Sequence, residues 1–250
     1  FSLLTYGASW VPWGIWAVLP DGSSGASSML FVIGIFGPFL AGAVLSRAEN
    51  RNMTSWLKAI FSVRCSARLY ILALVLPGIV LVIGSGIHQL LFDIAVQMET
   101  VPPWYEYPLY LGFVILIGGG LEEPGWRGYL LPKLQRQYSA LTSAVVVGIV
   151  WAVWHIPLFL IPSALQSSLS PILYVFQILA LSVVLTYITN AAGGSVIPAI
   201  LLHAEQAFRE LRKRSIRNQN CCRIDRRYLC AFRRFFPARF RTRVYRSLVP

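Results

Sequence analysis

Long apolar runs constrain this chain more than any other feature of its sequence. They cover residues 1–20, 29–45, 69–92, 108–121, 139–161, 171–190 and 195–208. Most of them approach the ~20 residues that a helix needs to cross the hydrocarbon core of a bilayer. A soluble protein would need an apolar core of improbable size to bury them all. The sequence therefore predicts an all-α, polytopic transmembrane helix bundle of about seven spans.

The composition agrees with this prediction. Hydrophobic residues make up 56% of the chain and charged residues only 13%, unlike a typical soluble protein. The net charge is +12, yet residues 1–208 contain eight basic and eight acidic side chains, so all of the excess lies in residues 209–250. The overall charge is therefore no ground for predicting nucleic-acid binding. We expect the lipid bilayer to be the partner of the apolar part.

The chain divides near residue 208 into two parts. Residues 1–208 show no internal repeat and are predicted to form one intramembrane domain, truncated at its C-terminal end, and the first residue, Phe1, need not be the true start. Residues 209–250 hold fourteen basic residues, thirteen of them Arg, in no helical or strand period. We expect this tail to be disordered or to come from a shifted reading frame. The alternative is an amphipathic segment that binds anionic lipids.

The basic residues also predict an orientation. Loops rich in Lys and Arg stay in the cytoplasm. The loop 46–68 carries five basic residues, and Lys133 and Arg136 follow the fourth run, so both sites are expected in the cytoplasm. The loop 93–107 has three acidic residues and no basic one, which predicts an external position. The N-terminus would then lie in the cytoplasm.

Three charged residues stand together at the end of the fourth apolar run: Glu122, Glu123 and Arg127. A charge at membrane depth costs at least ~2.5–3.5 kcal/mol, so such a group indicates a functional site. Glu123 and Arg127 are four apart in the favourable order for a helical ion pair. Glu122 points ~100° away on a helix and can face the bundle interior. Burial raises the pKa of a carboxyl group toward the range of a general base. The alternative for this stretch alone is a charged helix cap at the membrane boundary.

Two histidines lie in the apolar runs that follow this cluster, His155 and His203. Either one alone is typical of a core or interfacial residue, but together with an intramembrane acidic pair they predict hydrolytic chemistry. Two arrangements stay open. Glu122, His155 and His203 could bind a catalytic metal, Zn²⁺, with an open position for water. Alternatively, Glu122 and His155 could activate water directly while His203 donates to the oxyanion.

These residues resemble the motifs of the CPBP family of intramembrane proteases, the CAAX prenyl protease and bacteriocin-processing group often labelled Abi. The first family motif, E-E-x-x-x-R, is present as Glu122, Glu123 and Arg127. The second places an aromatic residue four before a His, and here Trp151 precedes His155 where Phe is usual. In the third, His203 fits, but Ala207 stands where the family has Asn or a similar residue.

The resemblance implies an endopeptidase of a prokaryotic membrane that cleaves a membrane-anchored protein or peptide near its C-terminus or anchor. It assigns water activation to Glu122 and His155, and oxyanion stabilisation to His203. Glu123 and Arg127 would support them, and family members are commonly labelled metalloproteases. The loss of one oxyanion donor costs ~10²–10³ in rate, so with Ala207 we predict weak or no activity for this copy. The alternative from another class is a non-enzymatic immunity, binding or transporter-like membrane protein, although the inverted repeats of transporters are lacking.

Overall fold

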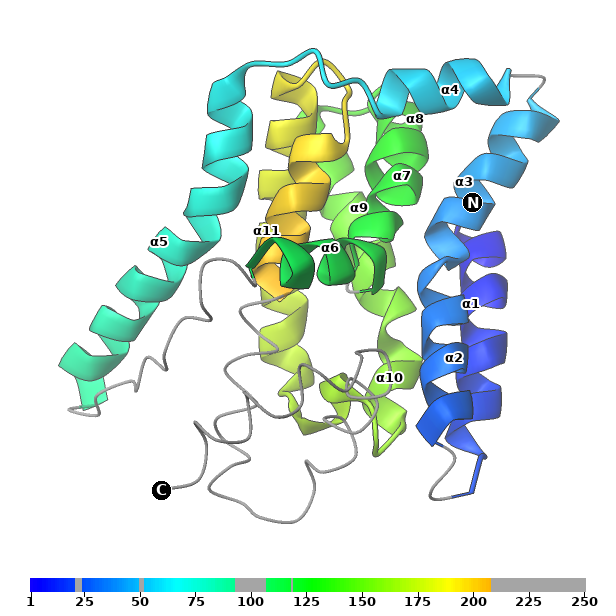
Figure 1. Cartoon of the computed structure of the whole chain (residues 1–250), viewed down its shortest axis with the longest axis vertical. Coiled ribbons are helices and arrows are strands. Elements are labelled where there is room, and N and C mark those ends of the chain that lie inside the picture. The colour runs from blue at the N-terminus through cyan, green and yellow to red at the C-terminus, as the bar shows by residue number, and fades with distance from the viewer. Residues whose placement is uncertain (21–23, 50–51, 93–106, 118, 208–250) are drawn as a thin grey trace.

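The computed structural model of the 250-residue chain describes residues 1–20, 24–49, 52–92, 107–117 and 119–207. Within these ranges all regular secondary structure is helical, which confirms the predicted all-α fold class (Figure 1). Of the loop predicted over 93–107, all but the last residue lies outside the described residues. The tail predicted over 209–250 lies wholly outside them.

The helices follow one another with short connections. The longer ones are α1 (Ser2–Ala17), α2 (Ser24–Ile35), α3 (Gly37–Ala48), α4 (Met53–Ile60), α5 (Ala67–Phe92), α6 (Tyr107–Ile117), α9 (Ala140–Trp154), α10 (Ile156–Leu160) and α11 (Pro171–Ala191). Between α6 and α9 the chain forms η1 (Gly120–Glu122), α7 (Glu123–Gly125), η2 (Trp126–Leu130) and α8 (Leu131–Leu134). A short turn, η3 (Leu165–Ser168), precedes α11, and a helix over 197–207 ends the described part.

Four described segments are long and apolar enough to cross a membrane: Gly25–Ala48, Ala67–Leu91, Ala140–Leu160 and Pro171–Ala191. They correspond to four of the predicted runs, so the count of seven spans is not confirmed. The other three runs form shorter helices. The 16 residues of α1 span about 24 Å, which is less than the ~30 Å hydrocarbon core. The 11 residues of α6 span about 16 Å.

Helix α5 is the least buried of the four membrane-length segments. In Figure 1 it leans away from the other helices, at one side of the bundle. Large apolar side chains on several of its faces are exposed, among them Ile71, Val75, Ile79 and Ile83. Soluble proteins rarely expose so much contiguous apolar surface. This exposure and the four apolar segments indicate an integral membrane protein.

Tryptophan side chains fill the centre of the bundle. Trp13, Trp126, Trp151 and Trp154 are almost fully buried in one core cluster. Buried aromatic residues with a polar end usually find a hydrogen-bond partner, and α1 uses this to attach to α9. Tyr6 Oη donates to the Val150 carbonyl at 2.9 Å, and Trp10 Nε1 donates to the Trp154 carbonyl at 3.0 Å. The first helix is thereby fixed against the helix that carries His155.

The stretch from Gly120 to Leu134 is held against α3 and α4. At Gly125 a Cβ would collide with the Pro38 carbonyl, so only glycine allows this close approach to α3. Trp56 Nε1 on α4 donates to the Gly128 carbonyl at 3.1 Å. At the far end Lys133 Nζ forms a 2.6 Å ion pair with Glu49 Oε2. These contacts fix the backbone that carries both glutamates.

Candidate active site

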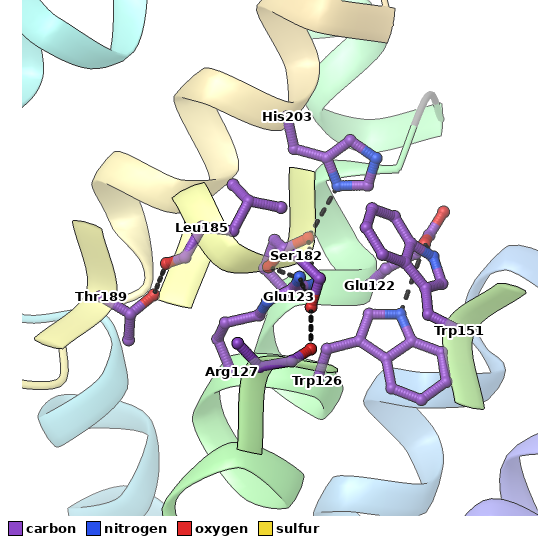
Figure 2. A network of polar contacts seen from close by, with 10 residues as sticks. Glu122, Glu123, Trp126, Arg127, Trp151, Ser182, Leu185, Thr189 and His203 are labelled. Carbon is purple, nitrogen blue, oxygen red and sulfur yellow. Dashed lines mark hydrogen bonds and ion pairs between the residues drawn. The ribbon is translucent and has the colours of Figure 1, made fainter. Parts of the chain in front are cut away.

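Glu122 lies at the end of η1 and is buried, with 5% of its surface exposed. Its Oε2 atom accepts hydrogen bonds from Trp151 Nε1 at 2.8 Å and from Trp126 Nε1 at 3.4 Å (Figure 2). An indole N–H can only donate, so both contacts favour a carboxylate oxygen as acceptor. Because the two indoles use the same oxygen, Oε1 remains for a reactant.

Glu123 forms the predicted ion pair with Arg127, and both side chains are fully buried. Arg127 Nη1 lies 3.1 Å from Glu123 Oε2 and 3.2 Å from Oε1. The same Oε1 atom lies 2.7 Å from His203 Nδ1, as Figure 2 shows. A buried charge is tolerated when it is paired and hydrogen-bonded. The i,i+4 pair is confirmed, and it also links the acidic segment to the last described helix.

Ser182 completes the surroundings of the guanidinium, and sequence reasoning did not find it. Arg127 Nη2 donates to Ser182 Oγ at 3.2 Å, and Ser182 Oγ donates to the Ala144 carbonyl on α9 at 2.7 Å. The signal was available, because Ser182, Thr186 and Thr189 repeat at helical spacing along an otherwise apolar span. All three are buried, so the polar face of α11 points into the bundle.

His155 lies at a break between α9 and α10. Pro157, near the start of α10, has no N–H to continue the ladder of α9. The main-chain N–H of His155 bonds to the Ala152 carbonyl at 3.2 Å, and the Trp151 carbonyl instead contacts His155 Nδ1 at 2.8 Å. A carbonyl oxygen only accepts, so Nδ1 carries the proton. Nε2 of the neutral ring is then a lone pair that can accept a hydrogen bond from water.

The contact of His203 with Glu123 sets its chemistry in the same way. A carboxylate accepts from Nδ1–H, which leaves Nε2 as a lone pair when the ring is neutral. Nε2 becomes a donor only in the imidazolium form, and Glu123 stands where it can compensate that charge. The expected oxyanion role of His203 therefore requires the protonated ring.

Gly119 marks the point where the reactive atoms face each other. Its φ is +110°, a conformation that L side chains rarely adopt. A Cβ on this residue would lie 2.7 Å from His203 Nε2 and 3.1 Å from Glu122 Oε1. Both atoms thus border one small space beside the Gly119 backbone. Sequence reasoning missed Gly119, because three consecutive glycines end this apolar run and their spacing does not distinguish one from the next.

Trp151 lies between the two histidines and the acidic segment. Its ring centroid is 5.9 Å from that of His155 and 5.0 Å from that of His203. The Arg127 guanidinium lies over its face at 4.8 Å, a cation–π geometry. The indole therefore contacts both the histidines and the cation of the site. The structure brings together all five predicted site residues, and their catalytic roles stay predictions.

The predicted metal site was Glu122, His155 and His203. Both imidazoles have Nδ1 anchored by a hydrogen bond and Nε2 free, as metal-binding histidines usually do. However, no three His, Cys, Asp or Glu side chains among the described residues are close enough together to hold a metal ion. As placed here, these three residues do not form a ligand set, so we derive no chemical step from a metal.

The backbone of the acidic segment is less regular than a single α-helix. It passes from a 3₁₀ turn at Gly120–Glu122 through one helical turn to a π-helical turn at Trp126–Leu130. Such π-turns occur often at functional sites. The sequence predicted a bend at Pro124 and Gly125, but both are helical, and the irregular turns lie on either side of them.

Comparison with known proteins identifies the domain to which these residues belong. Residues 103–207 match the family described as Type II CAAX prenyl endopeptidase Rce1-like. The chain carries an Rce1-like domain. A curated relative, CAAX prenyl protease 2 of Methanococcus maripaludis, is 24% identical to this chain and covers 81% of it and 80% of its own length. The matched Rce1-like region contains all five predicted site residues, together with Trp151 and Gly119.

Proposed function

We propose that this chain is an intramembrane endopeptidase of the CAAX-processing type. It would hydrolyse a peptide bond close to the membrane anchor of a membrane-anchored protein or peptide, in the cell membrane of a prokaryote. The observation that carries the proposal is the shared space beside Gly119, which Glu122 Oε1 and His203 Nε2 both border. A carboxylate and an imidazole that face one small buried space suit the activation of water and the binding of an oxyanion.

The contacts assign a role to each group in a metal-free hydrolysis. Glu122 Oε1 takes a proton from water, and His155 Nε2 accepts the second water hydrogen and orients the oxygen. The oxygen attacks the scissile carbonyl carbon, and the imidazolium of His203 donates to the oxyanion through Nε2–H. Glu122 then gives its proton to the leaving amine as the C–N bond breaks, which restores the carboxylate. Glu123 balances the charge of His203 throughout.

Arg127 supports this sequence without touching the reactants. It holds Glu123 through Nη1 and is itself held by Ser182 through Nη2. With Glu123 fixed, the ring of His203 keeps its orientation. We therefore propose that Arg127 and Ser182 are positioning residues, and that Glu122, His155 and His203 contact the reactants.

Ala207 remains a reason to expect low activity. It lies one helical turn after His203, at the end of the described part of helix 197–207, and packs partly buried beside Val114 and Ala204. A methyl group cannot donate a hydrogen bond to an oxyanion. Only His203 would then stabilise the negative charge, so we propose slow hydrolysis by this copy.

The expected Zn²⁺ is kept as a prediction for direct measurement. Metal analysis of the purified protein would show whether zinc copurifies, and dialysis against a chelator would show whether cleavage depends on it. Stoichiometric zinc whose removal abolishes cleavage would contradict the metal-free mechanism. Cleavage by metal-free protein would support it.

The proposed function is tested with a prenylated peptide in proteoliposomes and the variant Glu122→Gln. The amide cannot take a proton from water, so cleavage should stop, while peptide binding should survive. The control is Glu49→Gln, which removes a partly exposed carboxylate outside the site and should leave cleavage unchanged. Retained cleavage in Glu122→Gln would exclude the carboxylate as base. Peptide binding without cleavage by the unmodified chain would favour the non-enzymatic alternative.

A further inference from the structure

A second cavity lies next to Arg127, away from the space beside Gly119. Its volume is about 250 Å³. The buried side chains of Arg127, Leu131 and Thr189 form its floor, and exposed residues such as Pro132 and Asn190 form its rim. The cavity thus leads from the surface at the ends of α8 and α11 to the guanidinium that supports Glu123.

Two hydrogen-bond donors that line this cavity have no partner within the described part of the chain. Arg127 uses Nη1 for Glu123 and Nη2 for Ser182, but its Nε atom is buried without an acceptor there. The Gln135 Nε2 atom is buried in the same condition. Buried N–H groups in folded proteins nearly always bond to protein or to ordered water. Arg127 is 1% exposed, so its Nε atom cannot be satisfied by bulk solvent.

Water is the ligand that matches these groups. A water oxygen accepts two hydrogen bonds, one from each donor, and its own hydrogens can then bond to other waters. The cavity has room for several molecules, because each takes ~30 Å³ in the liquid. Among the described residues no Asp, Glu or second cation lines the cavity, and one guanidinium that is already paired with Glu123 gives no excess charge for an anion. Polar cavities of this size are normally hydrated, whereas apolar ones stay dry.

We infer that this cavity holds ordered water, bound by Arg127 Nε and Gln135 Nε2, and that Gln135 is a positioning residue of the site. The water would complete the bonds of the guanidinium and fix its plane against Glu123. Glu123 in turn holds His203 Nδ1 at 2.7 Å. The positioning role rests on the proposed hydrolytic function, whereas the hydration of the cavity does not.

X-ray hydroxyl-radical footprinting of the full chain in nanodiscs tests the hydration directly, because radicals formed from a bound water oxidise the side chains beside it. Leu131 is 1% exposed and lines the cavity, whereas Leu185 is 0% exposed and does not. We expect Leu131 to be oxidised and Leu185 to be protected. Gln135→Leu should reduce oxidation of Leu131 to the level of Leu185, and the exposed Gln137→Leu should not. Equal protection of both leucines in the unmodified chain would show that the cavity is dry and overturn the inference.

Cleavage kinetics test the positioning role separately. Gln135→Leu should lower kcat and leave KM unchanged, since the substrate does not contact this residue. Gln135→Asn keeps the amide and should restore kcat, and Gln137→Leu should behave like the unmodified chain. Loss of the water without loss of kcat would refute the positioning role. If the unmodified chain cleaves nothing, the proposed function has failed, and the footprinting result still decides whether the cavity binds water.

Discussion

The sharpest test of the site is the substitution Gly119→Ala. The added methyl carbon would lie 2.7 Å from His203 Nε2, while ordinary contacts begin at 3.4 Å. The ring would have to withdraw by about 0.7 Å, although Glu123 holds its other nitrogen at 2.7 Å. The methyl group would also crowd Glu122 Oε1 at 3.1 Å and occupy the space proposed for the attacking water.

The expected effect on rate follows from this displacement. A misplacement of ~1 Å in an active site can cost ~10²-fold in rate, which corresponds to about 2.7 kcal/mol in the activation free energy. The positive φ adds a separate penalty, because an L side chain in such a conformation costs ~1–3 kcal/mol of folding stability. We therefore expect Gly119→Ala to lower kcat about 100-fold and to lower the unfolding temperature as well.

Gly194→Ala separates the two effects. Gly194 has a φ of +91°, and a Cβ there would meet nothing within 4 Å. This variant should lose similar stability but keep its kcat. The assay is cleavage of a prenylated peptide in proteoliposomes, with thermal unfolding followed in parallel. Equal kcat losses in both variants would mean that backbone strain explains the effect, and full activity of Gly119→Ala would refute the geometry proposed for the site.

Three further changes test other parts of the structure. Arg127→Met should destabilise the protein by about 3–5 kcal/mol, because Glu123 stays buried without its partner, whereas Lys133→Met at the exposed pair should cost less than ~1 kcal/mol in the same unfolding assay. Ala207→Asn should raise kcat by up to ~10²-fold if it supplies the missing oxyanion donor, and an unchanged kcat would argue against that account of the low activity. Trp151→Phe keeps an aromatic ring but removes the 2.8 Å hydrogen bond to Glu122, so kcat should fall about tenfold, and no fall would show that the indole N–H is dispensable.

The parts of the site that the sequence predicted share one property, which is a local spacing. Glu123 and Arg127 are four residues apart, and that distance alone predicts the ion pair that the structure contains. Trp151 and His155 are also four apart, but their spacing predicted only a shared face. The bond between the His155 ring and the Trp151 carbonyl depends on how α9 ends, and periodicity does not reveal that.

The contacts that the sequence did not predict join residues far apart in the chain. Ser182 meets Arg127 across 55 positions, and His203 meets Glu123 across 80. Such pairs depend on how the helices pack, which a hydrophobic pattern leaves open. Length was the weak point for the spans, because an apolar run does not tell where a helix begins and ends. The run 108–121 illustrates this, since α6 stops at Ile117 and the chain turns at Gly119 before the glutamates.

The irregular end of α9 has a consequence for protein engineering. Pro157 would be an obvious position to replace in a programme that straightens helices to gain thermal stability. A continuous helix, however, would return the Trp151 carbonyl to the main-chain N–H of His155, and the imidazole would lose the acceptor that now fixes its proton. A sturdier fold would then come with a ring free to change tautomer. At this position the backbone hydrogen-bond pattern decides which ring nitrogen is basic.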